Sequence, residues 1–103
     1  MKTIDPNTLA QKLTERQHRV ILVDVRDAAK FKQGHIPGAL NVTIDRLAST
    51  MKSIAEKDDM IVTYCGGGTR APRAYHFLQT LGYENTICMP EGFRGWRKVK
   101  EIC

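Results

Sequence analysis

The sequence has no long hydrophobic run. No stretch approaches the ~18 consecutive apolar residues that a membrane-spanning helix requires. The amino terminus also lacks the apolar core of a secretory signal. We therefore expect a soluble protein that is not processed and does not act in a membrane.

Cysteine is scarce and shows no paired spacing. The chain has 3 cysteines, Cys65, Cys88 and Cys103, and no two of them form a C-x-x-C motif. This pattern argues against a disulfide framework, a zinc site or a dithiol redox motif. Because free cysteines suit a reducing compartment, we expect a cytoplasmic protein with no metal and no cofactor.

Aromatic residues make up only 7% of the chain, and they do not alternate with the basic residues. Nucleic-acid binding along stacked bases needs such alternation, so we expect no nucleic-acid partner. The net charge of +5 instead favours small anions or acidic partners near the surface. A modest basic cluster at residues 94–100 is interpreted as a solvated surface.

A chain of 103 residues has room for one small core, so we predict one domain over residues 1–103. The apolar runs at residues 20–23 and 60–64 predict strands buried on both faces, with shorter extended segments at 40–42 and 86–89. We predict helices after the Asp5-Pro6 pair, over residues 27–32, after Asp45, over residues 71–81 and over residues 92–99. This alternation predicts an α/β fold, a small mainly parallel sheet flanked by helices on both faces.

Specific residues are expected to start and line these helices. Asp5 is predicted to cap the first helix, with Ile4 packed on Leu9, and Asp27 and Asp45 are predicted to cap later ones. The apolar positions expected to face the core include Leu9, Leu13, Leu47, Met51, Ile54, Ala55, Ala74, Phe77, Leu78 and Leu81.

The chemistry is predicted at the end of the second buried strand. Cys65 follows that strand and is followed by Gly66, Gly67, Gly68, Thr69 and Arg70. Successive glycines let the backbone curl and turn several amides toward one point, and the next helix adds the positive end of its dipole. These amides favour a thiolate at Cys65, and the forked donors of Arg70 suit the oxygens of a thiosulfonate group. The alternative to a reactive thiolate is that Cys65 is an inert, buried small residue before a flexible turn.

Several separated segments together resemble the rhodanese family, over roughly residues 4–99. They are Asp24-Val25-Arg26, Phe31, Gly34 to Ala39, Asn41, Tyr64-Cys65, Gly68, Arg70, Ala71, Leu81-Gly82-Tyr83, Gly92 and Trp96. The resemblance implies a single-domain sulfurtransferase of the thiosulfate sulfurtransferase type, in which Cys65 carries a persulfide and Gly66 to Arg70 cradle it. It also implies that Asp24 and Arg26 support this loop. The implied substrates are a small anionic sulfur donor and a thiol or cyanide acceptor, with a protein acceptor also open.

Two departures and two alternatives accompany this resemblance. Glu91 replaces the first of two glycines common in the family, and residues 41–43 lack a proline often seen there.

A cysteine phosphatase or arsenate-type enzyme of the same fold is one alternative, but such loops resemble C-x5-R and here four residues separate Cys65 from Arg70. A sulfur-carrier or interaction module is the other. His35 is interpreted as part of a turn, and a sulfur relay through Cys103 or Cys88 stays open.

Overall fold

A computed structural model describes residues 1–15, 19–66 and 69–102, and it has a parallel β-sheet at its centre. The four strands are β1 (Val20–Asp24), β2 (Leu40–Asn41), β3 (Met60–Tyr64) and β4 (Thr86–Met89). They lie in the order β2-β1-β3-β4, and every pairing is parallel. The two predicted apolar runs are thus the central strands, where both faces need cover.

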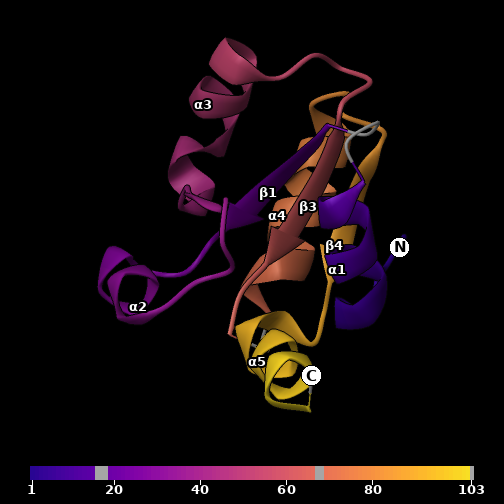
Figure 1. The fold of residues 1–103 in the computed structure, drawn as a ribbon. Coiled ribbons are helices and arrows are strands. Elements are labelled where there is room, and N and C mark those ends of the chain that lie inside the picture. The colour runs from indigo at the N-terminus through magenta and orange to yellow at the C-terminus, as the bar shows by residue number, and fades with distance from the viewer. Residues whose placement is uncertain (16–18, 67–68, 103) are drawn as a thin grey trace.

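Helices cover both faces of this sheet. They are α1 (Pro6–Thr14), α2 (Ala28–Gln33), α3 (Leu47–Ile54), α4 (Arg70–Thr80) and α5 (Gly92–Ile102), with a 3-10 turn η1 (Ile44–Arg46) before α3. α3 and α4 pack on one face, and α1 and α5 pack on the other (Figure 1). The predicted α/β architecture is therefore confirmed. None of the helices in the described ranges is long and apolar enough to cross a bilayer.

Side-chain alternation along β1 and β3 divides the core into two clusters. Ile21, Val23 and Ile61 pack in the cluster that also holds side chains from α3 and α4. Leu22 and Val62, one residue along each strand, pack in the cluster that holds Leu9 of α1 and Trp96 of α5. This is the two-residue period of a strand whose faces are both buried.

The predicted helix caps have different outcomes. Asp5 caps α1, because its carboxylate accepts from the Thr8 backbone N–H at 2.8 Å, and this bond lowers the pKa of Asp5. Asp27 stands at the start of α2 without a capping bond from its side chain. Asp45 does not cap a helix, so that prediction is wrong. It lies inside η1, which runs directly into α3, and its carboxylate accepts from the Thr43 hydroxyl at 2.6 Å.

Three apolar side chains expected in the core are partly exposed. Leu13 is 36% exposed, Phe77 37% and Ile54 38%. Ile54 is the last residue of α3, and Leu13 is next to the last residue of α1. Phe77 lies at the edge of the face of α4 that Ala74 and Leu78 bury. Side chains near the end of a helix, or at the edge of its buried face, thus lie outside the area that this narrow sheet covers.

Candidate active site

Cys65 lies at the carboxyl end of the central strand β3. In parallel sheets this edge is where ligands bind, because the strands end there and the following loops diverge. The side chain is only 3% exposed, and it packs partly against the α3 and α4 core cluster. It also lines a cavity of about 780 Å³ at this edge. Burial alone would fit an inert cysteine, but Cys65 also borders the cavity, so a small molecule bound there lies next to this residue.

The main chain at Cys65 is held by the last helix. The backbone N–H of Phe93, in the first turn of α5, donates to the Cys65 carbonyl at 2.7 Å. On the other side, the Thr63 hydroxyl donates to the Ala71 carbonyl at 3.1 Å, which fixes the first turn of α4 on β3. Both ends of the loop that begins at Cys65 are therefore anchored.

The loop predicted to cradle the substrate is described only at its two ends. At Gly66 nothing lies within 4 Å of the position a Cβ would take, so this end of the loop is open. Thr69 and Arg70 begin α4, are exposed and line the cavity. Gly67 and Gly68 lie outside the described residues. The amino terminus of α4 thus faces the cavity with the positive end of its dipole.

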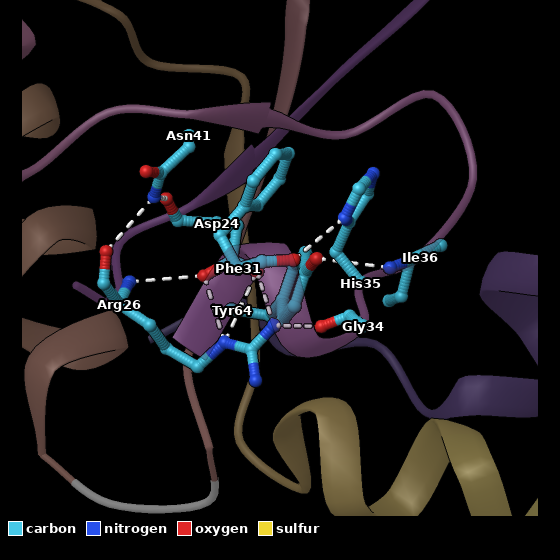
Figure 2. A network of polar contacts seen from close by, with 8 residues as sticks. All are labelled: Asp24, Arg26, Phe31, Gly34, His35, Ile36, Asn41 and Tyr64. Atoms are coloured by element: carbon cyan, nitrogen blue, oxygen red, sulfur yellow. Dashed lines mark hydrogen bonds and ion pairs between the residues drawn. The ribbon is translucent and has the colours of Figure 1, made fainter. Parts of the chain in front are cut away.

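Asp24 and Arg26 form a buried pair (Figure 2), and Arg26 also lines this cavity. The Arg26 guanidinium donates through Nε to both Asp24 carboxylate oxygens, at 3.0 and 3.1 Å, and through Nη2 to one of them at 2.7 Å. Nη2 also donates to the Gly34 carbonyl at 2.7 Å, and Asn41 donates to the Asp24 and Arg26 carbonyls. The hydrogen bonds to Asp24 raise the pKa of Arg26 above its ordinary value.

Aromatic rings complete the surroundings of Arg26. Its guanidinium carbon lies 4.6 Å from the centre of the Phe93 ring and 6.0 Å from that of Tyr64. The Tyr64 hydroxyl accepts from the Ile36 N–H at 3.1 Å, and burial raises the pKa of Tyr64 above its usual range. The described contacts of Arg26 thus reach the segment around Gly34 and the start of α5. Support of the cysteine loop by Asp24 and Arg26 stays a prediction.

The cavity is strongly cationic. The charged residues lining it are Arg26, Asp27, Lys30, Arg70, Arg94, Arg97 and Lys98, and Asp27 is the only carboxylate among them. Asp27 pairs with Arg70 at 3.3 Å, and both side chains are exposed. Sequence reasoning did not place Lys30 or the α5 cations at the site. The signal was the basic cluster of residues 94–100, in which Arg94, Arg97 and Lys98 recur at helical spacing.

Other chemically active side chains lie apart from the cavity. His35 stacks on Phe31 at 3.7 Å and places Nδ1 2.9 Å from the Phe31 carbonyl, as expected for a residue with a structural role. Cys88 is fully buried in β4, and burial raises the pKa of its thiol. Cys103 lies outside the described residues, so a sulfur relay through it stays an open question. No group of three His, Cys, Asp or Glu side chains suited to a metal ion occurs in the part of the chain that the structure describes.

Comparison with known proteins gives a consistent match. Residues 5–99 match the model of the rhodanese-like domain. A sulfurtransferase of Allochromatium vinosum is 34% identical over 95 residues, covering 92% of this chain and 87% of that protein. The thiosulfate sulfurtransferase GlpE of Tolumonas auensis is 32% identical over 80 residues, covering 78% and 74% of the two chains. Among solved structures, the Alr3790 protein of Anabaena is 27% identical with a TM-score of 0.87, covering 93% and 86% of the two chains.

Proposed function

The chain belongs to the rhodanese-like family, and on this premise we propose that it transfers a sulfane sulfur from thiosulfate to a thiol acceptor through a persulfide on Cys65. Relatives named thiosulfate sulfurtransferase support this choice of donor. The observation that carries the proposal is the position of Cys65, at the end of β3 and in the wall of a cationic cavity. In this proposal residues 1–103 act as one domain that carries out both half-reactions.

The first half-reaction loads the cysteine. The Cys65 thiolate attacks the outer sulfur of thiosulfate, and a bond forms between the two sulfurs. The sulfur–sulfur bond of thiosulfate breaks, and sulfite leaves with the electron pair. Total charge is conserved, and no external oxidant is needed. In this step the Arg70 guanidinium binds the sulfonate oxygens with its forked donors.

The second half-reaction discharges the persulfide. An acceptor thiolate attacks its terminal sulfur, and the electron pair of the breaking bond returns to Cys65. Amides of residues 66–70 and the amino terminus of α4 stabilise the charge on the terminal sulfur, as main-chain donors do for other bound anions. Cyanide serves as an alternative acceptor by the same displacement. Asp24 and Arg26 act as positioning residues at the cavity wall.

Mass spectrometry of the loaded protein tests this proposal. After incubation with thiosulfate and removal of the excess, we expect the mass of one added sulfur on the Cys65 peptide and one equivalent of released sulfite. Adding a thiol should remove that mass. The Cys65→Ser variant should accept no sulfur, whereas Cys88→Ser should load normally, because Cys88 is buried away from the cavity. Loading of Cys65→Ser, with wild-type folding by circular dichroism, would refute the assignment.

An aryl phosphate provides the matched assay for the phosphatase alternative. We expect no hydrolysis by the protein under conditions in which thiosulfate loads Cys65. The loop with four residues between cysteine and arginine presents fewer amides than the C-x5-R loop, so a tetrahedral phosphate is less well enclosed. Phosphate hydrolysis that depended on Cys65, without sulfur loading, would favour the alternative.

A further inference from the structure

We propose that the acceptor for the sulfur is a small thiol that carries several phosphate or carboxylate groups and binds in the cavity next to Cys65. This inference rests on the proposed function, because the acceptor must meet a persulfide on Cys65. It extends that function by giving a role to the cavity cations that thiosulfate does not need. The charge, the size and the arrangement of the cavity all fit such an acceptor.

The charge is greater than a small donor requires. Lys30 of α2 and Arg94, Arg97 and Lys98 of α5 line the cavity, in addition to Arg26 and Arg70. Arg26 is paired with Asp24, and Arg70 with Asp27. In the described part of the chain, no ion pair involves Lys30, Arg94, Arg97 or Lys98. These four cations are therefore available to an anionic ligand.

The size of the cavity also exceeds that of a small inorganic donor. A volume of about 780 Å³ falls within the range of pockets that bind organic ligands. Thiosulfate and cyanide consist of a few heavy atoms and would fill only a small part of it. Phe93 contributes a half-buried aromatic side chain to the wall, so the lining has an apolar surface as well as cations. An organic molecule with charged groups uses both features.

The arrangement places the cations around the sulfur rather than over the whole surface. Arg94, Arg97 and Lys98 lie at positions i, i+3 and i+4 of α5, which share one side of a helix. Lys30 lies on α2, and α2 and α5 are both found at the end of the sheet where β3 finishes (Figure 1). The negative groups of a ligand can then bind these cations while its thiol contacts Cys65.

The step itself balances without another reactant. The acceptor thiolate attacks the terminal sulfur of the Cys65 persulfide and becomes a persulfide. The bond between that sulfur and the Cys65 Sγ breaks, and Cys65 returns to a thiolate. Because the cations bind groups that do not react, they raise the affinity for the acceptor and lower its KM.

Coenzyme A and pantetheine provide the probes, because they share one thiol arm and only coenzyme A carries phosphates, together with an adenosine. The protein is loaded with thiosulfate, desalted, and mixed with each thiol at low salt, and loss of the added sulfur is followed by mass spectrometry. We expect coenzyme A to discharge Cys65 at least about tenfold faster than pantetheine at subsaturating concentration. Mercaptosuccinate against 2-mercaptoethanol gives the same comparison for carboxylates. The advantage should shrink toward one at about 0.5 M salt.

Two double variants locate the effect. Arg97→Gln with Lys98→Gln should lower the coenzyme A to pantetheine ratio roughly fivefold. Arg46→Gln with Lys52→Gln removes the same charge from exposed positions outside the cavity, and it should leave the ratio near that of the wild type. Equal effects of the two double variants would overturn the proposal in favour of general charge attraction. A wild-type ratio near one would also overturn it and would direct attention to an acidic protein acceptor.

The failure of this inference is distinguishable from failure of the proposed function. Loading by thiosulfate is measured first, before any acceptor is added. Binding of coenzyme A and pantetheine to the unloaded protein, by calorimetry, tests the cavity even if Cys65 takes up no sulfur. Tighter binding of coenzyme A that is lost in the Arg97→Gln, Lys98→Gln variant supports the site. Equal binding of the two thiols overturns it.

Discussion

Two arginines at the cavity each pair with an aspartate, but the pairs differ in burial. The Arg26 and Asp24 side chains are 10% and 0% exposed, whereas those of Arg70 and Asp27 are 52% and 68% exposed. A buried carboxylate has lost its water and depends on its partner, whereas an exposed pair contributes little because water already solvates both charges. The buried pair is therefore part of the fold, and the exposed pair is weak enough for Arg70 to leave Asp27, as its proposed role in binding the donor requires.

This difference predicts unequal effects of two similar substitutions. Arg26→Met should lower the free energy of unfolding by about 3–5 kcal/mol, because the buried Asp24 carboxylate loses the charge and the three hydrogen bonds of the guanidinium. Arg70→Met should change it by less than ~1 kcal/mol. Urea denaturation of the two variants measures both values. Adding Asp24→Asn to Arg26→Met should restore part of the loss. Equal effects of the two single variants would show that water reaches Asp24.

At the scale of elements, a glycine sets the position of α5. A Cβ built on Gly95 would lie 2.4 Å from the Glu91 Cβ and 3.4 Å from the Pro6 Cγ, on the first turn of α1. Real Cβ atoms do not approach as closely as 2.4 Å, so the chain turns from Glu91 into α5 in this way because residue 95 has no side chain, whereas the Pro6 contact is an ordinary one. α5 carries three of the cavity cations and the N–H that binds the Cys65 carbonyl. Close packing at Gly95 therefore supports the site.

We accordingly expect Gly95→Ala to destabilise the protein by about 1–3 kcal/mol, although alanine favours helices. The methyl group forces Glu91 or α5 to move. Arg94→Ala, at the exposed preceding position, is the matched control and should change stability by less than ~0.5 kcal/mol. Thermal unfolding of both variants gives the comparison. A Gly95→Ala protein as stable as the wild type would mean that the contact relaxes without cost.

The sequence predicted helices and strands correctly where residues strongly prefer one setting, such as a buried strand or the end of a helix. The β-branched run before Asp24 can satisfy its two apolar faces only inside a sheet, and it forms β1. Asp5 and Pro6 start α1, and Gly82 ends α4 with a φ of 98°. Such signals depend on nearest neighbours along the chain, so a single sequence contains them.

Contacts between distant segments were not predictable in the same way. Nothing local to Phe93 indicates that its N–H binds the Cys65 carbonyl or that its ring lies against Arg26. The same holds for Lys30, which reaches the cavity from α2. These placements depend on which end of the sheet each helix occupies. The position of Cys65 at a strand end could be predicted, because it depends only on where the strand ends along the chain.

For the molecule as a whole, the first residues join the two sides of the sheet. Thr3 forms a parallel bridge with Cys88, at the free edge of β4. The Cys88 N–H donates to the Lys2 carbonyl at 2.9 Å, and the Ile4 N–H donates to the Cys88 carbonyl at 3.0 Å. The Lys2 N–H donates to the Tyr75 hydroxyl of α4, whereas the Ile4 side chain packs in the cluster with α1 and α5. The segment thus closes an edge that would otherwise expose main-chain groups.

Deleting residues 2–4 should therefore weaken the whole fold rather than one end of it. The change removes the buried Ile4 side chain and two main-chain hydrogen bonds of Cys88, and we expect a loss of about 3 kcal/mol or more in the free energy of unfolding. Hydrogen exchange should show early loss of protection at the Cys88 amide. Tyr75→Phe removes only the acceptor for Lys2, so it should cost less than the deletion and leave that amide protected. A deletion variant with wild-type stability would mean that β4 forms a stable edge by itself.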